Sequence, residues 1–286
     1  IDRDEDREMI IVRYDEPTSS GVVEVHAYSK SDNAMMLKAS TFLSTGLESL
    51  TRIRTGYLID MIPAIFISGQ CNNKTGIATD ICAFRDGEFV NITIDPETGM
   101  SREIVSQYTV YCSDLTGDSI YEFPQTIAVR QYETQKSSET FWKIVWRNYD
   151  IYGKAHEVMQ TYHNYSDGWY FIIPDKWKNN ITVDRRDYVS GERTIVFSIY
   201  SGNSTLPTDM LAIYTLTGDN KEDRSALTGR FEIKNDQSEQ SRMDTIFAAR
   251  IYELDSDMRR YAITEDDVIN SFKFIQTEWL SGELSS

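Results

Sequence analysis

The chain has 286 residues, with 29 lysines and arginines against 45 aspartates and glutamates, and a formal net charge of −16 at pH 7. Hydrophobic residues make up 40% and charged residues 26%, which is typical of a folded globular protein and excludes a disordered chain. The excess of acid argues against nucleic acid as a partner, because a phosphate backbone repels a surface of the same sign. The longest apolar run, Met61–Ile67, is far shorter than a membrane-spanning helix of about 20 residues, so we expect no transmembrane segment.

The N-terminal part of the chain, residues 1–153, is predicted to be a mostly β domain. Short apolar or alternating runs are separated by turn signals such as Asp86-Gly87 and Thr98-Gly99. A spacing of roughly 8–12 residues between such runs is typical of antiparallel sheets. Leu47–Ile53 fits either a strand or a single helical turn. The expected strands are Met9–Val12, Val22–Tyr28, Ala64–Ile67, Ile77–Phe84, Phe89–Ile94, Ile104–Tyr111 and Thr126–Val129.

The first residues of the chain, IDRDEDRE, are strongly acidic and lead directly into the expected strand Met9–Val12. A dense acidic loop followed at once by a strand is more typical of the middle of a sequence than of its natural start. We therefore expect that further sequence precedes this segment and that Met9–Val12 forms an unpaired sheet edge.

The C-terminal part, residues 154–286, is predicted to be an α/β domain. Its final element is expected to be an amphipathic helix over Thr264–Leu280, because Thr264 can cap it and acidic residues fill its first turn. An apolar stripe should dock this helix on a sheet. The stripe consists of Val268, Phe272, Ile275 and Trp279. The expected strands are Trp169–Ile173, Thr194–Tyr200, Met210–Leu216, Phe231–Ile233 and Thr245–Glu253.

One segment, Asp114–Glu122, has the spacing of a calcium-binding loop. Oxygen-bearing side chains stand at relative positions 1, 3, 5 and 9, and a backbone carbonyl at position 7 can add a ligand. Calcium prefers six to eight oxygen ligands, which alternate positions of a tight loop can supply. The alternative is a metal-free loop in which Asp and Thr side chains bind backbone N–H groups. The predicted calcium ligands are Asp114, Thr116, Asp118, Ile120 and Glu122.

The loop Asp114–Glu122 resembles the D-x-D-G-D-G-x-x-[DE] calcium loop of FG-GAP repeats, also called VCBS repeats, of integrin α-type β-propellers. Three positions depart from that pattern: Thr116 replaces an acid, Ser119 replaces a glycine, and Glu122 is longer than the usual Asp. Asp2, Asp4 and Asp6 resemble a second, more degenerate copy, in which Ile10 stands where the last acid belongs. The resemblance implies a partial β-propeller in the N-terminal part.

Longer phrases extend the resemblance over most of the chain. Pro63–Gly69, Thr79–Thr93 and Asp167–Trp177 are similar to segments of clostridial-type secreted or lipid-anchored proteins that carry such a propeller. The phrase IIPDKW and the order of elements around it resemble the PsbP/Mog1-like α/β/α sandwich. These likenesses imply a location outside the cytoplasm on the bacterial cell, and they imply fold more than function.

Other residues give no specific chemistry. The three cysteines, Cys71, Cys82 and Cys112, are interpreted as small buried strand residues, and His26, His156 and His163 as surface or turn residues. The aromatic residues between Trp142 and Trp177 fit core packing better than a sugar-stacking platform. The sequence therefore predicts a non-enzymatic extracytoplasmic binding or scaffold protein, stabilised by calcium, with a protein or glycan partner at the cell surface. The alternative is a hydrolase of cell-wall or carbohydrate substrates that uses carboxylates at unassigned positions.

Overall fold

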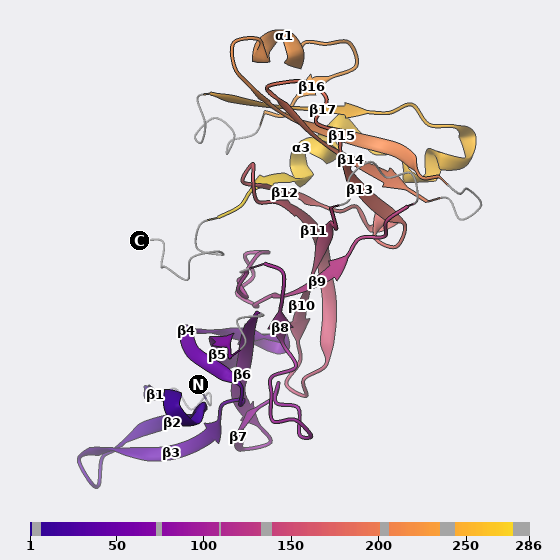
Figure 1. The fold of residues 1–286 in the computed structure, drawn as a ribbon. Helices are drawn as coiled ribbons and strands as arrows, with labels where there is room; N and C mark the ends of the chain where they lie inside the picture. Colours follow the sequence, from indigo (N-terminus) through magenta and orange to yellow (C-terminus); the bar gives the residue numbers. More distant parts are fainter. Residues whose placement is uncertain are drawn as a thin grey trace. The chain divides into compact units, whose positions relative to one another are not determined.

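The computed structural model describes residues 1, 7–72, 76–108, 110–132, 139–200, 206–234 and 244–276 (Figure 1). Across these ranges the protein is mostly β, and its four sheets are antiparallel. In the same ranges there is no helix of the length and apolarity that a membrane span requires. The chain divides into two compact units: one contains Ile1–Thr126 and Val145–Val158, and the other contains Ile127–Ile144 and Met159–Ile275. The domain boundary expected after residue 153 stays a prediction.

Two sheets belong to the first unit. One follows the order β1-β2-β3, so that β1 lies at its edge, and its strands are β1 (Glu8–Asp15), β2 (Ser20–Ser29) and β3 (Ala34–Phe42). The second sheet runs as a meander in sequence order, with a short additional strand, β8 (Ile104–Val105), paired to β6. The strands of this meander are β4 (Leu47–Leu58), β5 (Ile62–Cys71), β6 (Ile77–Arg85) and β7 (Glu88–Asn91).

The turn between β6 and β7 confirms one of the turn signals in the sequence. Asp86 and Gly87 both have positive φ, 53° and 88°, and the flanking residues Arg85 and Glu88 are paired. Two consecutive left-handed residues define a type I′ turn, whose twist matches that of the strands it joins. Farther along, the expected strand Ile104–Tyr111 is wrong beyond Val105, because Gln107 has a φ of 77° and interrupts the extended backbone.

The meander is buried on both faces, which explains the continuous apolar run in β5. Phe66 lies in a cluster with Leu58, Ile81 and Phe123, whereas the neighbouring residue Ile65 lies in a different cluster with Val23 and Phe89. Successive side chains of a strand point to opposite faces, so a strand covered on both sides reads as uninterrupted hydrophobics. The three cysteines fit this interior as expected, because all are buried and free, and burial raises the pKa of the Cys112 thiol to about 12.

The second unit combines two sheets and short helices. The sheet of order β18-β12-β11-β10-β9 contains β9 (Phe123–Ala128), β10 (Trp142–Tyr149), β11 (Ala155–Asn164), β12 (Trp169–Ile172) and β18 (Phe272–Phe274), and some of these strands also contribute residues to the first unit. The other sheet has the order β13-β14-β15-β17-β16. Its strands are β13 (Ile181–Arg185), β14 (Glu192–Ile199), β15 (Thr208–Thr217), β16 (Phe231–Glu232) and β17 (Thr245–Ile251).

The helical segments of both units are short. The α-helices are α1 (Lys221–Ser225) and α3 (Glu265–Ser271), and the 3-10 segments are η1 (Glu16–Thr18), η2 (Ile59–Met61), η3 (Asp175–Trp177) and η4 (Ser256–Tyr261). Helices of one or two turns are marginal alone and depend on tertiary contacts. The sheets therefore carry most of the fold.

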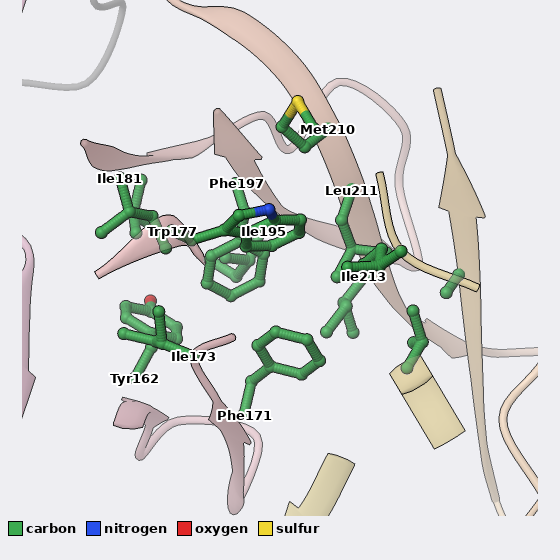
Figure 2. Packing of buried hydrophobic residues seen from close by; sticks show 14 of the residues in the cluster. Tyr162, Phe171, Ile173, Trp177, Ile181, Ile195, Phe197, Met210, Leu211 and Ile213 are labelled. Atoms are coloured by element: carbon green, nitrogen blue, oxygen red, sulfur yellow. The ribbon is translucent and has the colours of Figure 1, made fainter. Parts of the chain in front are cut away.

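Aromatic residues form the core of the second unit, as the packing interpretation predicts. Figure 2 shows Trp177 and Phe197 facing Phe171 and Tyr162 from different segments. The Phe197 ring centroid lies 5.2 Å from that of Phe171 and 5.3 Å from that of Tyr162. Trp177 is completely buried, and its indole Nε1–H donates to the carbonyl of Tyr261 at 2.8 Å. A buried indole N–H needs such an acceptor, so this bond fixes the ring in the core.

The predicted C-terminal helix begins correctly but ends much earlier than expected. The Thr264 hydroxyl accepts a hydrogen bond from the Asp267 backbone N–H, and the Asp267 carboxylate accepts one from the Thr264 backbone N–H. The two bonds form a capping box. The helix ends at Ser271, and Phe272–Phe274 forms β18 on β12, so the expectation of a helix through these residues is wrong. Phe272 and Phe274 both contact Phe247, because the alternation F-K-F places two rings on one face of a strand. The stripe residue Trp279 lies outside the described residues.

His163 also differs from its prediction. It lies buried on β11, where a surface or turn position was expected, and burial lowers the pKa of its imidazole to about 3. Its ring stacks on Tyr170 with centroids 5.2 Å apart. The residue is therefore a neutral core side chain of the second unit.

Candidate metal centre

The segment Asp114–Glu122 forms a loop of the first unit that leads into β9. The loop is closed by a two-residue bridge, in which Ser113 N–H donates to the Glu122 carbonyl at 3.0 Å and Glu122 N–H donates to the Ser113 carbonyl at 2.9 Å. Tyr121 N–H donates to the carbonyl of Tyr57 in β4 at 3.1 Å. The loop ends are thus fixed to each other and to the meander.

Asp114 organises the backbone inside the loop. Its carboxylate accepts from the N–H groups of Gly117, Asp118 and Ser119 at 2.7, 3.1 and 2.8 Å. Gly117 and Ser119 have φ values of 77° and 71°, so Ser119 adopts the left-handed conformation for which the calcium-loop pattern uses glycine. Asp118 in turn accepts from Ile120 N–H at 2.9 Å. The substitution of Ser119 for glycine therefore leaves the loop turn intact.

Glu122 is the buried acid of the loop. Its side chain is 0% exposed, and its Oε2 accepts from Leu115 N–H at 2.8 Å, whereas its Oε1 has no hydrogen-bond donor. Burial raises the pKa of this carboxyl to about 7, and the nearby charges of Asp118 and Asp114 act in the same direction. A buried carboxylate oxygen without a donor is costly, and a cation removes that cost.

The five predicted ligands lie in one closed loop. Asp114 and Asp118 are bonded to backbone N–H groups, as in the metal-free alternative, and Thr116 is exposed. Within the described ranges, no group of three or more His, Cys, Asp or Glu side chains is placed to hold a metal. The donor-free oxygen of Glu122 is the feature that fits an ion, because a carboxylate can accept an N–H bond and still bind a cation. The second copy, Asp2, Asp4 and Asp6, lies outside the described residues.

A second charged cluster, absent from the sequence predictions, lies in the second unit. Arg186 bridges Asp184 and Asp209, which come from β13 and β15. The acidic and basic residues around Arg186 are visible in the sequence, but the participation of Asp209 depends on strand pairing. A local spacing pattern therefore could not identify this cluster.

No protein-family model, curated protein or solved structure matched the chain. The antiparallel β fold and the two charged clusters are the features of the described residues that bear on function.

Proposed function

We propose that this protein is a non-enzymatic binding or scaffold protein that acts outside the cytoplasm, with calcium stabilising its first unit at the Asp114–Glu122 loop. The observation that carries the calcium proposal is the fully buried Glu122 oxygen without a donor, inside a loop of calcium-site spacing. A calcium ion there would have a structural role: its positive charge and its coordination by the loop oxygens would hold the loop in place on the sheet. The proposed partner is a protein or glycan at the cell surface, and the proposed location is secreted or lipid-anchored.

The proposed layout is a partial β-propeller joined to an α/β domain. The β4-β5-β6-β7 meander supports the first part, because a propeller blade is a four-stranded antiparallel sheet of this connectivity. The buried residue Val268 of α3 supports the second part, because it packs into the core formed with the strands of the second unit. Both likenesses concern architecture, and the proposed binding role rests on them only by analogy.

Calcium at about 10 mM is expected to raise the melting temperature by about 5 °C over that in chelator, because a ligand that binds only the folded state stabilises it. Asp118→Asn and Glu122→Gln should each remove most of this rise. The measurement is a thermal melt followed by circular dichroism. Asp86→Asn is the matched control, since Asp86 is an exposed acid in another tight turn of the same unit and its left-handed backbone suits asparagine.

Equal melting temperatures with calcium and with chelator would exclude the ion site and leave the metal-free loop. An equal calcium response in Asp86→Asn, Asp118→Asn and Glu122→Gln would place any ion elsewhere. The proposed location has its own test: antibody labelling of intact cells that express the entire coding sequence. Labelling only after the cells are permeabilised would contradict a surface location.

A further inference from the structure

A pocket of about 640 Å³ lies in the second unit, on the face of the β13-β14-β15-β17 sheet that points away from the aromatic core. On β14, Ile195 and Phe197 point into that core, whereas Val196 lies in a separate cluster on the opposite face. The register pairs Asp184 with Val196 and Ser198 with Asp209, which places both acids on the pocket side. A volume of this size suits a small-molecule ligand.

An ion cluster around Arg186 forms part of the pocket lining. The guanidinium donates twice to Asp209, at 2.5 and 2.9 Å, and its Nε–H donates to Asp184 at 3.2 Å. Asp209 also accepts from the Ser198 hydroxyl at 2.7 Å. Because the three guanidinium nitrogens all donate to carboxylates, Arg186 is poorly suited to bind an anionic ligand. The pKa of Arg186 is raised, chiefly by its hydrogen bonds to Asp209.

Asp184 is the member of the cluster that still lacks a donor. Its side chain lines the pocket, and the residue is 2% exposed. The Oδ2 atom accepts from Arg186 and from the Tyr132 hydroxyl at 3.4 Å, whereas Oδ1 has no hydrogen-bond partner. A buried carboxylate oxygen in this state is stabilised by an incoming N–H or O–H donor.

The charge of the pocket lining and its aromatic rings indicate whether the group that donates to Asp184 is a cation or a neutral hydroxyl. Asp184, Asp209 and Glu253 against Arg186 leave two uncompensated negative charges on the pocket lining, which favours a cation over a neutral sugar hydroxyl. Three tyrosines also line the pocket, and the faces of such rings attract cations, as the Arg250 guanidinium 5.1 Å from the Tyr252 ring centroid illustrates. They are Tyr132, Tyr188 and Tyr252. Burial, assisted by Asp209, raises the pKa of Tyr252 to about 12, so this ring keeps its proton and stays neutral at physiological pH.

We propose that this pocket binds the primary ammonium group of a small amine, with Asp184 as the main acceptor and Glu253 as a charge at the rim. The proposal concerns the second unit and stands independently of calcium at the Asp114–Glu122 loop. It adds a small-molecule ligand to the proposed binding protein, whose proposed partner is a protein or glycan at the cell surface. The ammonium would donate to Asp184 and lie against the tyrosine rings.

Isothermal titration of the whole chain with 1,5-diaminopentane at low ionic strength tests the proposal. We expect saturable binding below about 10 mM, with a dissociation constant raised about tenfold in Asp184→Asn. Glu253→Gln should weaken binding by about two- to fivefold, because an exposed charge contributes little. Glu88→Gln, a matched exposed glutamate in the first unit, should leave binding unchanged.

Two further ligands separate the kinds of interaction. 1,5-Bis(trimethylammonium)pentane carries the same two positive charges on the same spacer without an N–H group, and glucose carries O–H donors without a charge, so both should bind more weakly than 1,5-diaminopentane. Circular dichroism reports whether Asp184→Asn is folded; if it is not, Glu253→Gln against Glu88→Gln decides. Absence of saturable amine binding, equal binding of 1,5-bis(trimethylammonium)pentane or of glucose, or equal affinity in Glu253→Gln and Glu88→Gln would overturn the proposal.

Discussion

Replacing Phe197 by alanine is expected to lower the free energy of unfolding by about 3–5 kcal/mol. Its side chain is 0% exposed and contacts the rings of Tyr162 and Phe171 in the centre of the second unit. The substitution removes apolar burial and leaves a cavity that strands on several sides cannot close. Urea unfolding followed by tryptophan fluorescence measures the loss.

Phe42→Ala provides the matched control. Phe42 lies at the end of β3 and is 74% exposed, so its replacement should change the free energy of unfolding by no more than about 0.5 kcal/mol. A similar cost for the two variants would contradict the burial that places Phe197 in the core. The comparison holds the chemical change constant and varies only the environment.

In calcium-free buffer, Glu122→Gln is expected to stabilise the protein above pH 7. Burial raises the pKa of Glu122 from 4.5 to about 7, so the folded state holds this proton more tightly than the unfolded state does. The stability contributed by the protonated carboxyl is therefore complete below pH 4.5 and is lost as the pH rises to 7, by about 1–2 kcal/mol once solvent screening is allowed for. Glutamine stays neutral and avoids this loss, so the variant and the parent should differ little near pH 5.

Urea unfolding at several pH values measures this difference, with Glu88→Gln as a control whose stability should follow that of the parent. Calcium should reverse the order, because the parent offers the ion a carboxylate and the glutamine variant does not. If Glu122→Gln and the parent lose stability in parallel between pH 5 and 8, the carboxyl does not carry the penalty that its burial implies.

Strands with regular alternation and local turn chemistry could be predicted from the sequence. Ile77–Phe84 and the Asp86-Gly87 turn are examples, because both signals lie within a few residues. The strand β3 was missed, since its Ala, Met, Leu and Lys residues favour a helix and only pairing with β2 makes it extended. The strand β11 was missed as well, because buried residues such as His163 interrupt its apolar pattern.

The Asp114–Glu122 loop and the Arg186 cluster also differ in how far they could be predicted from the sequence. The Asp114–Glu122 loop was predictable as a unit because the hydrogen bonds that its side chains accept join residues at most seven positions apart. The burial of Glu122 was not predictable, since it depends on how the loop packs. Arg186 and Asp209 are 23 positions apart and meet only because β13 and β15 flank β14. The pairing of strands, which no spacing pattern encodes, creates that pocket.

The division of the chain into two interleaved units has a consequence for synthesis. Residues 127–144 belong to the second unit, yet they emerge from the ribosome before residues 145–158 of the first. The first unit therefore cannot be completed until a segment of its neighbour has already been made, and the second must wait for residues up to 275. Domains that are continuous in sequence fold one after another during translation. We therefore expect the nascent chain to keep partly assembled sheets, with unpaired strand edges, until late in translation.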